Sequence, residues 1–188
     1  SGIRVATVDE STVTVGGPAA DQRNVIAANG EDGIRFDCLA SVSACFDNSV
    51  VLGNAIGVGA DGSPLGNGGH GIHVAAMDGG RLTIGGEMPG EKNRIAHNVG
   101  NGVLATHGGL GRLTVSVNEI FANGRIGFDL GGDGRTPNDP GDGDTGPNGL
   151  QNFPTVTAYT LAPSGDAASI TVQIDTPDIT GNYPMTVD

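Results

Sequence analysis

The segment Asn93-Arg-Ile95-Ala-His-Asn98-Val-Gly-Asn-Gly102-Val103-Leu104-Ala105 is the clearest copy of a motif that recurs along the chain. In this copy an asparagine stands four residues before a glycine, and an apolar, a variable and an apolar residue follow the glycine. Three more segments share the pattern: residues 24–36, residues 118–130, and residues 54–74 with an insertion from 57 to 66. Matches at such fixed internal spacing indicate a repeat protein, in which each repeat must stack on its neighbours.

The spacing and composition of the repeats predict short strands that wind into a coil. Successive leading asparagines are 30, 39 and 25 residues apart, and the longest interval contains the insertion. No segment has the 3.6-residue apolar period of a helix, whereas apolar-variable-apolar triplets are typical of very short strands. Strand-like stretches at 12–15, 49–52, 82–84 and 113–115 supply another side of each coil. These features predict a β-solenoid; the alternative is a β-sandwich with glycine-rich turns.

Stacking of the repeats makes a specific prediction about register. Equivalent isoleucines should form one buried column of inward side chains: Ile26, Ile56, Ile95 and Ile120. Equivalent asparagines should lie at one turn position, about 4.8 Å apart, and hydrogen-bond as a ladder: Asn29, Asn67, Asn98 and Asn123.

Three longer blocks resemble bacterial secreted proteins with a right-handed parallel β-helix, the pectate-lyase-like fold. They are residues 15–34 with Val15-Gly-Gly, residues 54–72 with Asn54-Ala-Ile-Gly, and residues 127–154 with Gly127-Phe-Asp-Leu-Gly-Gly. The likeness covers residues 12–157 and implies an all-β right-handed parallel β-helix of about four to five coils within residues 1–154. This fold carries enzymes, adhesins and passive stalks alike, so it does not indicate an activity.

A change of pattern near residue 155 predicts a second β module in residues 155–188. Longer alternating strands are expected at 155–159, 169–174 and 183–187. In the proteins that this chain resembles, a β-sandwich often follows the helix, and these segments are expected to be its first strands. Three strands do not close a sandwich, so we expect the module to be truncated.

Composition narrows the classes of partner. The formal net charge is −12, and nine scattered basic residues do not provide the clustered charge that a nucleic-acid binder needs. The same acidity disfavours polyanionic substrates such as uronate polymers. No apolar run reaches the ~18 residues of a membrane-spanning helix. We therefore expect neither nucleic-acid binding nor membrane insertion.

Two cysteines, Cys38 and Cys45, lie close together in the sequence. Such a pair favours a disulfide that closes a small loop in an oxidising compartment, and the alternative is two free thiols in a cytosolic protein. We expect the disulfide, and with it a secreted or cell-surface protein.

An acidic loop at residues 131–152 is the sharpest local feature. Four carboxylates fall within twelve residues: Asp133, Asp139, Asp142 and Asp144. Carboxylates that crowd together repel one another unless a cation lies among them, and hard oxygen ligands on a flexible loop suit Ca²⁺. The sequence therefore predicts a calcium-bound cap on the last coil, with Phe153 folding back over the open end. The alternative is a hydrated acidic cap without metal.

The outward positions of the triplets give weak catalytic candidates. If the repeats stack, Arg35, His73 and Asp129 lie in one outward column that Leu104 interrupts. No second acidic residue occupies this column to form a glycosidase pair, so a solvated polar stripe is the expected reading. Sugar sites often use exposed aromatic rings, but aromatic residues are few here and Phe36 and Phe128 are expected to point inward.

These observations favour a non-catalytic function. We expect an extracellular segment of a larger secreted bacterial protein that is structural or adhesive, or contacts a polysaccharide or other cell-surface ligand, beside other domains of the same parent chain. The alternative is a polysaccharide lyase or glycoside hydrolase that acts on the outer sheet face.

Overall fold

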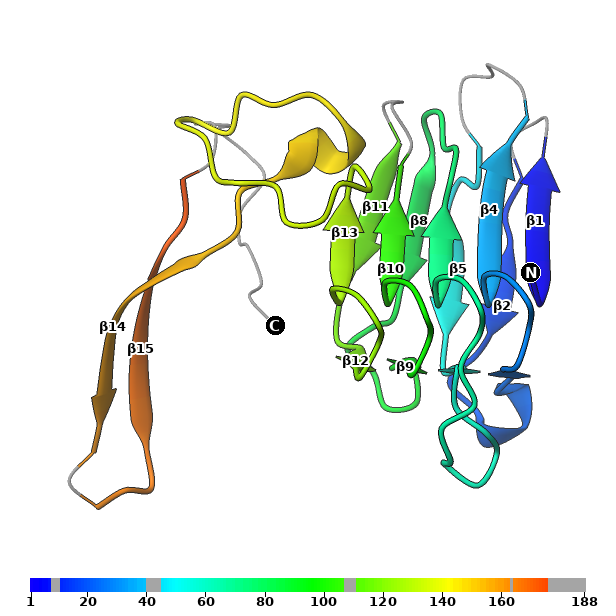
Figure 1. Ribbon diagram of the computed structural model, residues 1–188, viewed down its shortest axis with the longest axis horizontal. Helices are drawn as coiled ribbons and strands as arrows, with labels where there is room; N and C mark the ends of the chain where they lie inside the picture. The colour runs from blue at the N-terminus through cyan, green and yellow to red at the C-terminus, as the bar shows by residue number, and fades with distance from the viewer. Residues whose placement is uncertain (8–10, 40–44, 107–110, 163, 176–188) are drawn as a thin grey trace.

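A computed structural model describes residues 1–7, 11–39, 45–106, 111–162 and 164–175 of the chain. Within these residues the protein is all-β apart from two short 3-10 turns, η1 (Ala20–Gln22) and η2 (Pro147–Leu150). Three parallel sheets form one body, and an antiparallel pair of strands stands beside it (Figure 1).

The three parallel sheets, named A, B and C, each contain strands that recur along the chain. Sheet A has the order β1 (Ile3–Thr7), β4 (Ile34–Cys38), β7 (Ile72–Val74), β10 (Val103–Ala105) and β13 (Phe128–Leu130). Sheet B has the order β2 (Thr14–Gly16), β5 (Ser49–Leu52), β8 (Arg81–Ile84) and β11 (Arg112–Val115). Sheet C has the order β3 (Val25–Ile26), β6 (Ala55–Ile56), β9 (Arg94–Ala96) and β12 (Glu119–Phe121).

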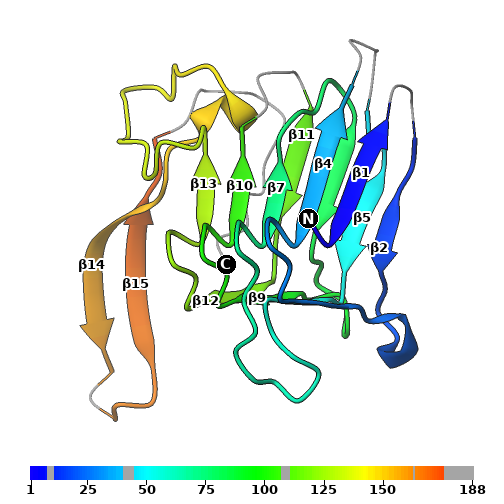
Figure 2. The same cartoon turned by 45° about the vertical axis from the view of Figure 1, so that its right-hand side comes forward.

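The chain visits these sheets in a fixed cycle. After β1 it passes through B, C and A in turn, so that β2, β3 and β4 make one coil and every later coil repeats the cycle (Figure 2). Each strand pairs in parallel with its counterpart in the neighbouring coil. This arrangement is compatible with a β-solenoid, and it differs from the antiparallel pairing that a β-sandwich would show.

The predicted repeat register is confirmed. Ile26 pairs with Ile56, Ile56 with Ile95, and Ile95 with Ile120. The first three are buried, whereas Ile120 is half-buried because it belongs to the last coil. Alternate strand residues point to opposite sides, so these isoleucines share the interior with the inward residues of sheets A and B.

Two asparagine ladders run through the turns on either side of sheet C. One contains Asn24, Asn54, Asn93 and Asn118, and the other contains Asn29, Asn67, Asn98 and Asn123. In each ladder the side-chain Nδ2 donates to the Oδ1 of the next coil's asparagine, at 2.7–3.0 Å. The backbone N–H of each donor asparagine also reaches that Oδ1. These bonds satisfy turn backbone that would otherwise be buried without partners.

The first strand extends the repeat beyond the segments that the sequence revealed. Ile3 pairs with Ile34 and Val5 with Phe36, so Gly2-Ile3-Arg4-Val5 occupies the place of Gly33-Ile34-Arg35-Phe36. Without the leading asparagine, this copy did not match the full pattern.

The predicted disulfide joins Cys38 to Cys45 between β4 and β5. Residues 40–44 lie outside the described part of the chain, but Phe46, next to Cys45, is fully buried and packs edge-on against Phe36 at 5.2 Å between ring centroids. The disulfide indicates an oxidising environment.

After the acidic loop, strand pairing changes from parallel to antiparallel. β14 (Thr155–Leu161) pairs with β15 (Ala168–Gln173) in a hairpin whose residues are exposed on both faces. The third strand that the sequence predicts, at 183–187, lies outside the described residues. In the described part of the chain, no helix is long and apolar enough to span a membrane.

Candidate functional site

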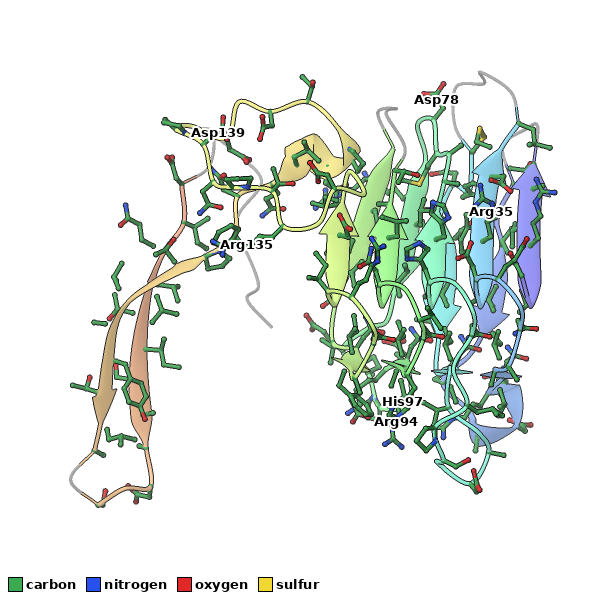
Figure 3. All side chains as sticks on the ribbon, viewed as in Figure 1. Arg35, Asp78, Arg94, His97, Arg135 and Asp139 are labelled. Carbon is green, nitrogen blue, oxygen red and sulfur yellow. A yellow bond between two sulfur atoms is a disulfide. The ribbon has the colours of Figure 1, made fainter. Side chains whose placement is uncertain are left out.

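The outer face of sheet A contains the predicted column. Parallel register aligns five outward residues: Arg4, Arg35, His73, Leu104 and Asp129. Figure 3 shows Arg35 on this face of β4. The alignment places basic and imidazole groups in adjacent coils, close enough for direct contact.

Arg35 and His73 do meet, and Asp32 joins them. The Arg35 Nη1 lies 2.8 Å from His73 Nδ1 and 3.6 Å from an Asp32 carboxylate oxygen. That same oxygen, Asp32 Oδ2, lies 3.3 Å from His73 Nδ1. Asp32 precedes the repeat glycine Gly33, so the turn between sheets C and A places its side chain next to Arg35 and His73.

The protonation of His73 decides which of these contacts is a hydrogen bond. An arginine N–H can only donate, so a bond from Arg35 requires an unprotonated Nδ1 on His73. The Nε2–H of this neutral tautomer then donates to the Thr106 hydroxyl, 3.1 Å away. In the imidazolium form, Nδ1–H would instead donate to Asp32, and the Arg35 Nη1 would lose His73 as an acceptor while its Nε keeps Asp37.

A second carboxylate, Asp37, binds both arginines of the column. Arg4 Nε donates to Asp37 at 2.7 Å, and Arg35 Nε donates to it at 3.0 Å. Asp37 follows Arg35 by two residues on the same side of β4. The Asp37 side chain is 9% exposed, so the two guanidinium groups bind a carboxylate that is largely shielded from water.

These partners set the charge of the acids on this face. Burial alone would raise the pKa of Asp32, but hydrogen bonds from the His73 side chain and the His70 N–H lower it to about 2. Burial likewise opposes ionisation of Asp37, and the hydrogen bonds from Arg4 and Arg35 bring the pKa below its usual value. Burial lowers the pKa of His70, whose Nδ1 accepts from the Asn101 N–H. Both acids are therefore ionised at neutral pH, and His70 is neutral.

Asp129, the last member of the predicted column, does not join this cluster. It is 1% exposed, and its carboxylate accepts from the Asn101 side chain and from the Gly132 N–H. Leu104 lies between it and His73 and is itself 6% exposed. The column is thus a half-buried ion-pair cluster followed by a separate buried acid, and the expected solvated stripe is wrong.

The acidic residues that complete the cluster were missed at the sequence level, although signals for them exist. Asp32 stands directly before Gly33, as His70 stands before Gly71, so both belong to one turn column. Asp37 stands two residues after Arg35 and must share its strand face. Neither acid is the middle residue of a triplet, so the outward column of middle residues does not include them.

The acidic loop forms a network in which asparagines bind peptide groups. Asn138 exchanges two hydrogen bonds with Phe153, Asn148 with Leu113 of β11, and Asn152 with Asp139. The Asn148 pair covers the edge of sheet B at the last coil, which supports a capping role for this loop.

The four predicted calcium ligands lie on this loop, and Figure 3 labels Asp139. Asp139 accepts from the Gly143 N–H, and Asp142 accepts from the Asn152 N–H. Asp139 Oδ1 is enclosed and accepts no hydrogen bond, so it is an acceptor that a cation would suit. In the described residues, however, no group of three or more acidic, histidine or cysteine side chains gathers as a metal site. Calcium binding by Asp133, Asp139, Asp142 and Asp144 stays a prediction.

An apolar cavity of about 800 Å³ opens where the last coil meets this loop. Phe128 and Leu130 of β13 line it together with Leu150, Phe153 and Val156. Phe128 is in the inward column, as expected, but it remains 36% exposed because no further coil covers it. Phe153 lines this cavity as well, with Arg135 stacked on its ring at 4.2 Å.

Comparison with known proteins finds no relative of this chain. No family model matches the chain, no curated protein matches it, and neither does any solved structure. The site must therefore be interpreted from its own geometry.

Proposed function

We propose that this chain is a right-handed parallel β-helix segment of a larger secreted or cell-surface protein, with a structural or adhesive, carbohydrate-contacting role. Three stacked parallel sheets, the repeated order of B, C and A, and the asparagine ladders support the helix. The disulfide supports an extracellular location. The exposed hairpin of β14 and β15 is the proposed start of a β-sandwich module.

The observation that supports a non-catalytic role is the mutual pairing of charges on the outer face of sheet A. Asp37 binds Arg4 and Arg35, and Asp32 contacts both Arg35 and His73, so two of the three candidates are already held by acids, while Asp129 is held by Asn101. General acid–base catalysis requires groups whose pKa values are placed near the working pH. Asp32 and Asp37 have lowered pKa values instead, as structural ion pairs do.

A specific observation favours the alternative of an enzyme that cleaves polysaccharides. Asp32, His73 and His70 lie together, with the two imidazole rings 5.4 Å apart, and histidine is a common general base. A lyase that uses such a base would abstract a proton from a sugar ring near Arg35.

One experiment separates the two functions. The chain is incubated with neutral and uronate polysaccharides, and both new reducing ends and unsaturated products are measured. We expect no product above a blank, with retention of the protein on at least one neutral polymer. Product formation that disappears in His73→Ala, but persists in the distant variant Asp166→Ala, would replace the proposed function with the enzymatic one.

A further inference from the structure

The outer face of sheet C carries an aromatic residue at a position where the other coils have small ones. The residues that follow the inward isoleucines are Ala27, Gly57, Ala96 and Phe121. Phe121, at the end of β12, is 40% exposed and pairs with Ala96 in the neighbouring strand. The repeat therefore does not require an aromatic ring here, and Phe121 is not part of the hydrophobic core cluster.

Two side chains from the neighbouring coil hold the Phe121 ring. The Arg94 guanidinium lies over it at 5.2 Å from the centroid, and the His97 ring meets it edge-on at 5.7 Å. Figure 3 shows Arg94 and His97 close together at the lower edge of the three-sheet stack. Such contacts fix the orientation of an exposed ring, which reduces the conformational entropy that a bound ligand would have to remove.

Charged groups continue this cluster along the same face. Lys92, the only lysine of the chain, donates to Glu119 at 2.8 Å, and Arg94 lies 3.7 Å from the same carboxylate. All three side chains are about half exposed. The cluster thus presents N–H donors on either side of a carboxylate acceptor, next to an apolar ring.

We propose that Phe121, Arg94, His97, Lys92 and Glu119 form a binding site for a neutral hexopyranose unit of a polysaccharide. The inference deepens the proposed function and rests on it. A pyranose ring presents C–H groups on its face, which suit the 40% of Phe121 that Arg94 and His97 leave exposed. Its neighbouring hydroxyls both donate and accept, so they match the mixed donors and acceptor of Lys92, Arg94 and Glu119.

The charge of the protein selects neutral over acidic sugars. The cluster carries a local surplus of one positive charge, whereas the whole chain carries −12. A polyuronate extends over many charges and therefore meets the field of the whole molecule rather than that of one cluster. A neutral polymer pays no such repulsion and can use the ring and the hydroxyl contacts together.

The test is affinity gel electrophoresis of the full chain in gels that contain hydroxyethyl cellulose, β-1,3-glucan, xyloglucan, galactomannan or polygalacturonate. We expect retardation by at least one neutral polymer and none by polygalacturonate. Phe121→Ala should weaken binding about tenfold, since one stacking contact is lost, while Phe121→Trp should retain it. Tyr159→Ala is the matched control, because Tyr159 is an exposed aromatic on the hairpin.

The outcomes separate this inference from the function on which it rests. Binding that Phe121→Ala leaves unchanged, with an unaltered melting curve, overturns the site but keeps a carbohydrate-contacting function. Retardation by polygalacturonate alone overturns the ligand class. Retardation by none of the five polymers overturns both the site and the carbohydrate part of the proposed function. A Phe121→Ala chain that melts early is replaced in the assay by Phe121→Leu, which keeps an apolar side chain and removes the ring.

Discussion

Asparagine side chains satisfy the backbone in two regions of this molecule, and they do so in opposite ways. In the three-sheet stack, each ladder asparagine passes hydrogen bonds to the same residue type one coil away. In the loop of residues 131–152, each asparagine pairs with a different peptide group, as Asn148 does with Leu113. The ladder asparagines of the inner coils are at most 1% exposed, whereas in the loop Asn138 is exposed, Asn148 is half-buried and Asn152 is 4% exposed.

This difference in burial predicts that the ladder asparagines contribute more to the free energy of unfolding than the exposed loop asparagines do. Substitution of a ladder asparagine leaves the asparagines of both neighbouring coils without that hydrogen-bond partner in a buried turn. Loss of an exposed loop asparagine such as Asn138 leaves groups that water can hydrate. The two regions should therefore respond very differently to the same substitution.

Asn98→Ala should have the largest effect. It removes the acceptor of two Asn67 bonds and the donor to Asn123, all in a buried turn. Unsatisfied buried polar groups cost about 1–3 kcal/mol each, so we expect a loss of about 3–5 kcal/mol in the free energy of unfolding. Chemical denaturation measures this free energy. The control is Asn138→Ala at an exposed position, which should lower the free energy of unfolding by less than about 1 kcal/mol. Equal losses in the two variants would remove the distinction between ladder and loop.

A glycine column sharpens the same contrast between inner coils and the open end. A Cβ at Gly71 would lie 2.4 Å from Ile95 Cγ2 and 2.6 Å from the Gly102 carbonyl oxygen. At Gly127, the equivalent glycine of the last coil, the nearest atom would be 3.5 Å away. Gly71→Ala should destabilise the fold by about 2–3 kcal/mol, and Gly127→Ala should change it by less than about 1 kcal/mol. Thermal melts of both variants test this, and a stable Gly71→Ala would mean that the coils are not packed as described.

The repetition of one coil along the stack explains how much of the fold could be predicted from the sequence. Each coil faces a near-copy of itself, so Ile26 and Ile95 share an environment and the repeat alone gives their register. The same reasoning located the outward column of Arg35 and His73. The first strand could not be predicted from the full repeat, because its copy has no leading asparagine, although Ile3-Arg4-Val5 keeps the apolar-variable-apolar triplet.

Features that do not repeat could not be obtained in this way. The pairing of Asn148 with the edge of β11 depends on how one loop turns back, and no second copy shows its geometry. The contact of Phe121 with Arg94 and His97 requires knowing which coil ends the stack. Asp32 could be predicted from the repeat, because it occupies the same turn position as His70, one residue before the repeat glycine.

The outer face of sheet A should contribute to stability through charge rather than through packing. The pKa of Asp32 is about 2 in the folded chain, against 3.8 for the free group, so folding favours its ionised form. That contribution is complete above about pH 5 and is lost as the pH falls through 4 toward 2. We expect a loss of about 1–2 kcal/mol, measured by denaturation between pH 6 and pH 2.5. Asp32→Asn should flatten this part of the profile, and a profile identical to the parent would place the acid sensitivity elsewhere.

The smallest expected effect concerns the acidic loop and its predicted calcium. Asp139 Oδ1 is enclosed without a hydrogen-bond donor, and Asp142 and Asp144 follow it on the same bent segment. A cation that binds only the folded state stabilises it by RT ln(1 + [L]/Kd), which is about 1 kcal/mol when calcium exceeds a millimolar Kd about fivefold. Melting in calcium, and then with chelator, measures this shift.

Asp142→Asn is the matched variant for this test. The amide retains the oxygen that accepts from the Asn152 N–H but removes the charge that calcium requires. The calcium-dependent shift in melting temperature should therefore disappear in Asp142→Asn, while Asp166→Ala, on the β14–β15 hairpin, should keep it. If calcium leaves the melting of the parent chain unchanged, the loop is a hydrated cap held by its asparagine pairs alone. The ladder and the loop would then both depend on amide hydrogen bonds, differing in whether those bonds repeat from coil to coil.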